Sequence, residues 1–420
     1  MIVGGTVRVP GDKSITHRAL LLAALARGTT YIGGALTSLD ARSSARVLRQ
    51  LGAEVSPLRA GQVTTVKGRR RFKRAEEPLN CGNSGTTARL LLGALAGHNF
   101  SATLTGDRSL RRRPMRRVTT PLAQMGLRVQ ESAGDGLPLR IHGGRLAPLR
   151  WELPVSSAQI KSALLLAGVT GAVPVALREP HGRSRDHTER MLRAFGFEVD
   201  ESSDGWIAFA PTGRIEPFDL QVPGDPSSAA FLIGAALLAE RGELRVAAVG
   251  LNPTRIRFLD VLARMGAKPA IVGSHEAHGE PVGDVIVTPA PLGGTEVEAA
   301  EIPSLIDEIP LLAALASHAK GETVFRQVGE LRVKESDRLG LIASNLRAVG
   351  KRAEVQGEDL WIEGTPDVPK GVVRTAGDHR IAMAFAVLGT LPKARIKVDD
   401  MKCAAVSFPG FEQALRSIRR

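Results

Sequence analysis

The stretch VPGDKSITHRALLLAALA, residues 9–26, decides the fold, because it recurs as VPGDPSSAAFLIGAALLA at residues 222–239. Four looser copies combine a small or polar turn with an Ala/Leu-rich run, at residues 81–97, 155–168, 302–317 and 376–389. The copies follow one another at about 70 to 80 residues, and self-similarity at a fixed period indicates a repeated structural unit. We therefore predict six copies of one strand–turn–helix unit.

A second, more polar helix keeps the same period. It ends in a glycine followed by a short extended stretch, as in LRQLGAEV (48–55), LAQMGLRV (122–129), LRAFGFEV (192–199), LARMGAKP (262–269) and LRAVGKRAEV (346–355). A glycine at this position supplies a left-handed C-cap. Each unit is expected to hold one apolar helix, one amphipathic helix and a few strands.

The ends of the chain suggest how the units are grouped. The sixth unit ends in FEQALRSIRR (411–420) with no strand after it, and the spare strand at residues 2–10 is expected to complete that unit. A chain of 420 residues is long for one domain. We predict three units per lobe, with residues 1–11 and 223–420 forming lobe I and residues 12–222 forming lobe II.

The charge of the chain favours anionic partners. The formal net charge is +13, and 44 of the 56 cationic residues are arginine. The planar arginine fork suits phosphate and carboxylate, although a GC-rich genome also enriches arginine. Nucleic acid is disfavoured as a partner, because no aromatic residues interleave the basic stretches and Tyr31 is the only tyrosine.

The sequence lacks the motifs of several classes of protein. Cys81 and Cys403 are far apart, which suits a reducing cytoplasm, and Cys81 is expected to be a small core residue. His275 and His278 do not have the H-E-x-x-H spacing of a zinc site. Neither phosphate-binding glycine motif is present, no charged-then-apolar leader is visible, and the apolar runs are too short to span a membrane. We expect a cytoplasmic protein without metal or nucleotide cofactor.

Charged residues gather at or near the turns that precede helices. Helix N-termini attract anions, so a cleft lined by such turns would be positive. Capping and surface salt bridges are the simpler explanations of the same residues. The candidates are Lys13, Ser14, Arg18, Arg108, Arg111–Arg113, Arg183, Arg185, Asp307, Glu308, Lys334, Glu335, Asp337, Arg338, His379 and Arg380.

Eight segments in order resemble one family. They are GDKSITHR, GNSGTTARL, TGDRSLRRRPM, SSAQIKSALLLAG, SRDHTE, IDEIP, LRVKESDRL and GDHRIAM, from Gly11 to Met383, with SFPGF (407–411) as a weaker tail. The chain thus resembles the 5-enolpyruvylshikimate-3-phosphate synthases, or 3-phosphoshikimate 1-carboxyvinyltransferases. The resemblance implies an α/β, two-lobed enolpyruvyl transferase-like fold of six βαβαββ-type repeats, whose lobes close over the substrates and exclude water.

The resemblance also implies an activity. Such an enzyme transfers the carboxyvinyl (enolpyruvyl) group of phosphoenolpyruvate to the 5-hydroxyl of shikimate 3-phosphate and releases phosphate, on the shikimate pathway to chorismate and the aromatic amino acids. The chemistry needs an acid, a base and positive charge, but neither metal nor nucleotide. The implied partners are these two small molecules, with no nucleic acid or membrane, and the protein is expected to be a monomer.

Site residues follow from the resemblance position by position. It implies binding of shikimate 3-phosphate by Lys13, Ser14, Arg18, Ser157, Ala158, Gln159, Arg185, Asp307 and Lys334. It implies binding of phosphoenolpyruvate by Lys13, Asn83, Gly85, Arg113, Gln159, Glu335, Arg338, His379 and Arg380. Asp307 would accept the 5-hydroxyl proton, and Glu335 would protonate the methylene, with Lys13 and His379 as rivals.

Two departures from the family pattern qualify this picture. Some members carry a lysine where this chain has Val406, so the site has either one cation fewer or a cation supplied from elsewhere, with Lys402 and Arg108 as the candidates. Glyphosate tolerance is linked to an alanine at the position of Gly85, which predicts a glyphosate-sensitive enzyme. The S-A-Q pattern at residues 157–159, however, also occurs in a branch that includes tolerant enzymes.

Two other functions are compatible with parts of this pattern. A transferase of enolpyruvyl to UDP-N-acetylglucosamine resembles the same fold, but it commonly carries a cysteine in a mobile loop, and residues 107–115 have none. A basic RNA-binding or RNA-end-processing protein of similar repeats is the remote alternative, which salt-sensitive RNA binding in a gel shift would reveal.

Overall fold

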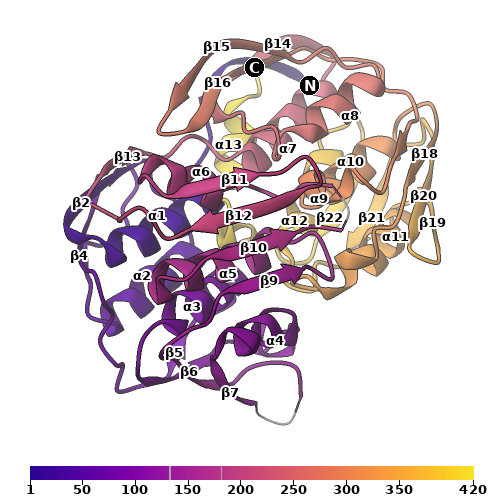
Figure 1. Ribbon diagram of the computed structural model, residues 1–420. Helices are drawn as coiled ribbons and strands as arrows, with labels where there is room; N and C mark the ends of the chain where they lie inside the picture. Colours follow the sequence, from indigo (N-terminus) through magenta and orange to yellow (C-terminus); the bar gives the residue numbers. More distant parts are fainter. Residues whose placement is uncertain (132–133, 181) are drawn as a thin grey trace. The chain divides into compact units, whose positions relative to one another are not determined.

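The computed structural model describes residues 1–131, 134–180 and 182–420, which divide into two compact units (Figure 1). Unit 1 comprises residues 1–10, 223–277 and 281–420, and unit 2 comprises residues 11–222 together with His278–Glu280. Each unit has an apolar core of its own, built mainly from Ala, Leu, Val and Ile. The tip at His278–Glu280 groups with unit 2, although the sequence placed it in lobe I.

Six helices of the described chain are buried on most sides, as the Ala/Leu-rich runs predicted. Side chains at the preceding residue cap four of them, because Asp12, Ser84, Asp225 and Asp378 each accept a backbone N–H of the first turn. The buried helices are α1 (Lys13–Leu25), α3 (Gly85–Ala96), α5 (Ala158–Gly171), α7 (Pro226–Leu237), α10 (Ile309–Ala316) and α12 (His379–Leu388).

Six more helices expose one face, and they alternate with the buried ones along the chain. They are α2 (Leu39–Gln50), α4 (Arg116–Met125), α6 (His187–Ala194), α8 (Arg257–Arg264), α11 (Arg338–Ala348) and α13 (Phe411–Ser417). The glycines predicted to end five of them have φ between 78° and 115°, which confirms the left-handed cap. They are Gly52, Gly126, Gly196, Gly266 and Gly350.

The described residues of unit 2 form three four-stranded sheets, each with one parallel and two antiparallel pairs. The strands are β2 (Arg27–Gly33), β3 (Glu54–Val55), β4 (Thr64–Arg69), β5 (Leu79–Asn80), β6 (Ser101–Thr105), β7 (Arg128–Glu131), β8 (Leu139–His142), β9 (Leu149–Glu152), β10 (Val175–Arg178), β11 (Glu198–Glu201), β12 (Trp206–Ala210) and β13 (Asp219–Gln221). Their orders are β13-β2-β4-β3, β5-β6-β8-β7 and β11-β12-β10-β9. The second and third repeats therefore follow the predicted βαβαββ order.

Unit 1 holds two four-stranded sheets and one pair of strands, in the orders β1-β14-β16-β15, β17-β18-β20-β19 and β21-β22. The strands are β1 (Ile2–Arg8), β14 (Arg241–Gly250), β15 (Ala270–Ala277), β16 (Glu280–Val287), β17 (Glu296–Val297), β18 (Gly321–Phe325), β19 (Arg352–Gln356), β20 (Asp359–Gly364), β21 (Lys370–Val373) and β22 (Arg395–Val398). Short helices α9 (Ile302–Leu305), η1 (Leu110–Arg112), η2 (Gly329–Val333) and η3 (Lys402–Val406) complete the two units.

The N-terminal strand joins a sheet that the sequence did not predict. It pairs in parallel with β14, from Ile2 opposite Arg241 to Arg8 opposite Ala247, so it completes the fourth repeat and not the sixth. β13, which precedes the fourth repeat in sequence, pairs with β2 of the first repeat. Each of these two repeats thus receives its first strand from a distant part of the chain, because a parallel partner must enter from a separate segment.

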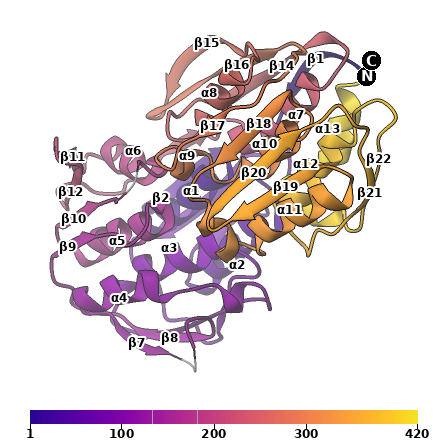
Figure 2. The same ribbon diagram turned by 90° about the vertical axis from the view of Figure 1, so that its right-hand side faces the viewer.

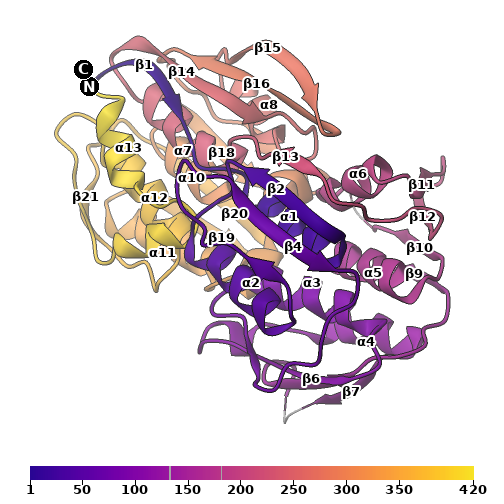
Figure 3. The ribbon, with the colours of Figure 1, turned by 90° about the vertical axis from the view of Figure 1, so that its left-hand side faces the viewer.

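The two ends of the chain nevertheless contact each other within unit 1. Val3 forms an antiparallel bridge with Arg419, and the backbone N–H of Arg420 donates to the carbonyl oxygen of Ile2 over 3.1 Å. The N and C labels lie side by side in Figures 2 and 3.

A close helix contact in unit 2 positions two of the predicted site turns. A β-carbon at Gly93 of α3 would lie 1.8 Å from the carbonyl oxygen of Ala163 in α5, so only glycine allows this approach. The first turns of these helices hold Gly85 and Gln159. Close packing of the two backbones thus brings the two turns within reach of each other's side chains.

Candidate functional site

The first turn of α1 presents Lys13 beside a buried carboxylate. Asp12 caps the helix, with its Oδ1 accepting the backbone N–H of Ile15 over 2.8 Å. The Lys13 ammonium forms an ion pair with Asp40 of α2, and its side chain is only 16% exposed. The ion pair with Asp40 therefore holds the Lys13 ammonium at the N-terminus of α1, a position suited to contact with an anionic substrate.

Ser14, Arg18 and Arg185 gather around the same turn. The buried Arg18 donates to the Ser14 carbonyl oxygen over 3.0 Å, to Thr188 Oγ1 over 2.7 Å and to Ser162 Oγ over 2.6 Å. Arg185 Nη1 donates to Ser14 Oγ over 3.3 Å. Arg18 thereby joins α1, α5 and α6, and the structure brings together three of the residues predicted for shikimate 3-phosphate.

A buried lysine supports the loop that carries Arg185. Lys161 Nζ lies 2.9 Å from Glu179 Oε2 and 2.8 Å from Glu189 Oε1, and it donates to the Ser184 carbonyl oxygen over 3.2 Å. Burial alone would lower the pKa of Lys161, but the two carboxylates outweigh it and raise that pKa. Lys161 is therefore charged, and it ties α5 to the residue that precedes Arg185.

The first turn of α3 is crowded by guanidinium groups. Arg113 Nη2 donates to Asn83 Oδ1 over 2.8 Å, and Asn83 Nδ2 donates to Asp107 Oδ2 over 2.7 Å. A β-carbon at Gly85 would lie 3.1 Å from Arg113 Nη1 and 3.3 Å from Arg89 Nη1. The structure thus groups Asn83, Gly85 and Arg113, all three predicted for phosphoenolpyruvate.

Arg89 is a member of this group that the sequence analysis missed. It donates to Gln159 Oε1 and to the Pro114 carbonyl oxygen, while Gln159 Nε2 donates to Thr86 Oγ1 over 3.0 Å. The signal was present in the repeats, because aligning GNSGTTARL with GDKSITHRA places Arg89 opposite Arg18. Gln159 therefore lies against the turn of α3, as expected for a residue predicted to meet both substrates.

Ser157 and Ala158 mark the start of α5. Ser157 immediately precedes the helix and makes no capping hydrogen bond with its side chain, unlike the residues that cap α1 and α3. A helix end whose first N–H groups are not capped by their own side chain is suited to an anion. This placement is compatible with the predicted contact to shikimate 3-phosphate.

In unit 1, Asp307 lies in the turn between α9 and α10 and faces two arginines. Its Oδ1 is 3.2 Å from Arg338 Nη1 and 3.5 Å from Arg380 Nε, and its carbonyl oxygen accepts from Arg380 Nη1 over 3.0 Å. Its side chain is 18% exposed, so solvent reaches part of it. Glu308, the next residue, is buried and hydrogen-bonds Ser227.

Arg338 lies at the centre of three carboxylates. Its Nη1 meets Asp307, its Nη2 meets Glu335, and its Nε donates to Asp378 Oδ2 over 2.8 Å. Burial opposes the charge of Arg338, but the three carboxylates together raise its pKa. Asp378, which the sequence analysis missed as a site residue, would have a raised pKa from burial, yet Arg338 holds that pKa below its usual value.

Lys334 and His379 complete the predicted set in unit 1. Burial lowers the pKa of Lys334, against an opposing effect of Glu330, whose Oε1 lies 3.8 Å from Lys334 Nζ. His379 is buried as the first residue of α12, directly after the capping Asp378. The structure thus groups Asp307, Glu335, Arg338 and Arg380 by direct contact, with His379 adjacent in sequence.

Other features of the sequence lie outside the proposed site. Arg255 Nη2 lies 3.0 Å from both Asp225 Oδ1 and Ser227 Oγ, so a guanidinium of the protein itself occupies the turn at the start of α7. Cys81 is fully buried, and burial raises the pKa of its thiol to about 12, which fits a core residue. In the described ranges no His, Cys, Asp or Glu cluster suits a metal ion, and no helix is long and apolar enough to cross a membrane.

Comparisons with known proteins point to one family. The sequence model for EPSP synthase (3-phosphoshikimate 1-carboxyvinyltransferase) matches residues 2–415. The 3-phosphoshikimate 1-carboxyvinyltransferase of Desulforudis audaxviator (strain MP104C) is 46% identical over 418 residues, covering 99% of this chain and 97% of the relative. That of Xanthomonas campestris pv. campestris (strain B100) is 44% identical over 411 residues, covering 97% and 93%.

Solved structures agree with this finding. The EPSP synthase from Acinetobacter baumannii has a TM-score of 0.86 at 36% sequence identity, covering 100% of this chain and 96% of that chain. The enolpyruvyl transferase NikO from Streptomyces tendae has a TM-score of 0.78 at 21% identity, covering 99% and 95%, and it shares the fold.

Proposed function

Because the chain belongs to the EPSP synthase family, we propose that the side chains described above carry the family's reaction. The protein transfers the enolpyruvyl group of phosphoenolpyruvate to shikimate 3-phosphate, and its fold is the two-lobed α/β fold of the enolpyruvyl transferases. The transfer to UDP-N-acetylglucosamine is not favoured. We assign the individual roles to residues of both units.

Shikimate 3-phosphate is proposed to bind through the first turns of α1 and α5. The contacts among Ser14, Arg18 and Arg185 support this, because they form a preorganised cationic group. The guanidinium of Arg18 is held in a fixed orientation by its bonds to Ser14, Thr188 and Ser162. The proposed ligands are Lys13, Ser14, Arg18, Ser157, Ala158, Gln159, Arg185, Asp307 and Lys334.

Phosphoenolpyruvate is proposed to bind at the first turn of α3 and through the arginines of unit 1. The position of Gly85 supports this, because a β-carbon there would lie 3.1 Å from Arg113 Nη1 and 3.3 Å from Arg89 Nη1, so glycine keeps side-chain atoms out of the space beside both guanidiniums. Bidentate arginine pairs are the strong ligands of phosphate and carboxylate. The proposed ligands are Lys13, Asn83, Gly85, Arg113, Gln159, Glu335, Arg338, His379 and Arg380, and we add Arg89.

Two proton transfers are assigned to carboxyl groups of unit 1. Asp307 accepts the 5-hydroxyl proton as the oxygen bonds to the enol carbon, and Glu335 protonates the methylene, with Lys13 and His379 as rivals. The tetrahedral adduct then loses phosphate and a proton from the new methyl group. This assignment rests on the contacts of Arg338. Its guanidinium forms ion pairs with both Asp307 and Glu335, so the proposed base and the proposed acid lie beside the same cation.

We propose a monomer in the cytoplasm, three repeats per lobe, and a cation from Lys402 or Arg108 in place of the lysine absent at Val406. Gly85 supports sensitivity to glyphosate. Inhibition measured against competing phosphoenolpyruvate tests that sensitivity, and no inhibition at millimolar glyphosate would contradict it. Size-exclusion chromatography with light scattering tests the monomer.

The deciding experiment measures phosphate release from phosphoenolpyruvate. Shikimate 3-phosphate should trigger it and UDP-N-acetylglucosamine should not. Asp307→Asn keeps the shape of the side chain but removes the base, so kcat should fall by about 10²-fold or more while the Kd of shikimate 3-phosphate changes little. If Asp307→Asn has the same kcat as the wild type, Asp307 is not the base.

A further inference from the structure

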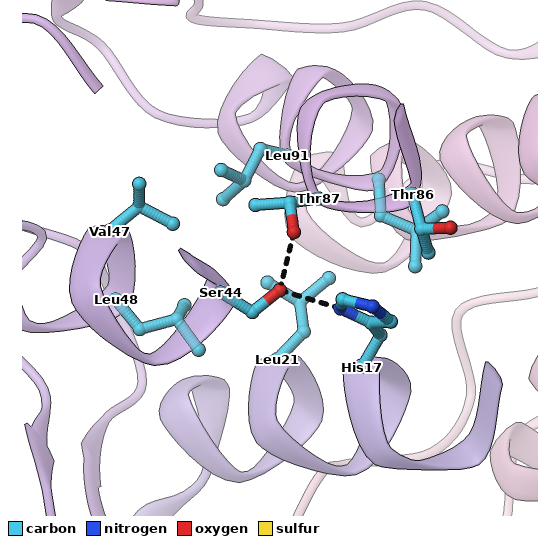
Figure 4. A pocket seen from close by; sticks show the side chains of 9 residues that line it. His17, Leu21, Ser44, Val47, Leu48, Thr86, Thr87 and Leu91 are labelled. Atoms are coloured by element: carbon cyan, nitrogen blue, oxygen red, sulfur yellow. Dashed lines mark hydrogen bonds between the residues drawn. The ribbon is translucent and has the colours of Figure 1, made fainter. Parts of the chain in front are cut away.

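A chain of hydrogen bonds runs through the interior of unit 2, and Figure 4 shows its first two bonds, from His17 to Ser44 and from Ser44 to Thr87. His17 Nδ1 of α1 lies 2.7 Å from Ser44 Oγ of α2, and Ser44 Oγ lies 2.7 Å from Thr87 Oγ1 of α3. Thr87 Oγ1 donates to Ser84 Oγ over 2.8 Å. Ser84 is the residue that caps α3. This hydrogen-bond chain thus links α1, α2 and the cap of α3.

The donor-to-acceptor direction of these hydrogen bonds fixes the tautomer of His17. A hydroxyl has one proton, and Thr87 gives its proton to Ser84. Ser44 must then donate to Thr87, and His17 must donate to Ser44 from Nδ1–H. Every bond points from the histidine towards the cap of α3, so replacing the imidazole by an apolar group leaves Ser44 without its donor.

His17 is neutral in this position. Burial lowers its pKa well below the usual value, as do the neighbouring Lys13 and Arg18, with Asp12 opposing them. A neutral imidazole with its proton on Nδ1 is what the hydrogen-bond chain requires. The ring therefore acts as a fixed donor and not as a titrating group.

Water cannot easily replace the bonds of this chain. His17, Ser44, Thr87 and Ser84 are each no more than 5% exposed. The adjoining cavity is lined mostly by leucine and valine and has a volume of about 10 Å³, room for one water at most. A group that loses its partner here stays unpaired, so the chain is a rigid link and not a solvated contact.

We propose that His17 is a positioning residue, which sets the first turn of α1 with Lys13, Ser14 and Arg18 relative to the first turn of α3 with Gly85 and Arg89. Each turn lies within one helical turn of a member of the chain: Lys13 and Ser14 precede His17, while Gly85 lies between Ser84 and Thr87. The inference rests on the proposed function, since those turns are the proposed substrate ligands.

The test compares three variants by steady-state phosphate release and by thermal unfolding. His17→Leu removes the donor, whereas His17→Asn places an amide N–H close to the position of Nδ1. His98→Leu is the matched control, because His98 is also a buried histidine of unit 2, but it accepts from the Phe72 N–H over 3.0 Å beyond the opposite end of α3.

His17→Leu should lower kcat/KM for both substrates by about 10- to 100-fold, the size of effect that small misplacements of ligands produce. His17→Asn should restore kcat/KM to within about threefold of wild type. His98→Leu should unfold at a lower temperature yet keep the kcat/KM of wild type. Rescue by asparagine together with an unaffected control is the result expected for positioning.

Other outcomes would overturn the proposal. Equal kinetics of His17→Leu and wild type would do so, as would His17→Asn performing no better than His17→Leu at equal stability. If His17→Leu does not fold, Thr87→Val interrupts the same chain with a side chain of the same shape and should lower kcat/KM similarly; normal kinetics there would overturn it. Wild type inactive on shikimate 3-phosphate would instead refute the proposed function.

Discussion

Gly85 lies against the guanidinium of Arg113, so that a β-carbon on Gly85 would stand 3.1 Å from Arg113 Nη1. Arg89 Nη1 would be 3.3 Å from the same carbon. Both guanidiniums are buried and held by other bonds, Arg113 by Asn83 and Arg89 by Gln159. Neither can retreat without breaking such a bond, so the space above Gly85 is tightly limited.

We therefore expect Gly85→Ala to displace both forks by a few tenths of an ångström. The KM of phosphoenolpyruvate should rise about tenfold, while the KM of shikimate 3-phosphate stays within about twofold. The control is Gly144→Ala, since a β-carbon there meets only Asn99 Oδ1 at 3.9 Å. Initial-rate kinetics at varied phosphoenolpyruvate measure the effect, and an unchanged KM would contradict the crowding argument.

Arg89 should contribute its geometry as well as its charge. Arg89→Lys keeps a cation but cannot bond Gln159 and Pro114 together, so the KM of phosphoenolpyruvate should rise about tenfold or more. Arg46→Lys is the matched control, because Arg46 is an exposed arginine of α2 that donates to the Asn80 carbonyl oxygen. Similar kinetics for the two variants would remove Arg89 from the site.

Arg338 should be needed for the stability of unit 1. Arg338→Met leaves Asp307, Glu335 and Asp378 without their shared cation, and breaking a buried ion pair typically costs about 3–5 kcal/mol. Arg332→Met removes an exposed pair with Asp337 and should cost below about 1 kcal/mol. Denaturant unfolding followed by circular dichroism gives both values, and equal costs would show that the three contacts are not stabilising.

His98 should make the protein less stable as the pH falls. Burial lowers its pKa to about 4 in the folded state, against about 6.5 when unfolded, so only the unfolded chain takes up a proton between these values. The contribution of His98 to the unfolding free energy is therefore complete above about pH 6.5. It declines by up to about 3 kcal/mol as the pH falls towards 4.

The measurement is the unfolding free energy of wild type and of His98→Leu between pH 4 and 8. Their difference isolates His98 from His17, whose pKa is lowered in the same direction. The wild-type slope should exceed that of the variant in this interval. Parallel curves would show that His98 does not titrate differently in the folded and unfolded states.

Local patterns made much of the fold predictable. Ala/Leu runs bury a helix wherever the chain places it, and a glycine after an amphipathic helix takes the left-handed conformation for steric reasons that involve only its neighbours. The prediction for the N-terminal strand was wrong, because strand pairing joins residues far apart in sequence. Ile2 and Arg241 are partners although 239 positions separate them.

The candidate site divides in the same way. The sequence by itself determined the repeats, the helix turns and the chemical type of the residues at those turns, including Lys13, Arg113 and Asp307. Only the tertiary structure decided that Arg89 bonds Gln159 and that Asp378 joins Asp307 and Glu335 around Arg338. Turns and caps depend on neighbouring residues, whereas an ion-pair cluster depends on how distant helices pack, which no local pattern encodes.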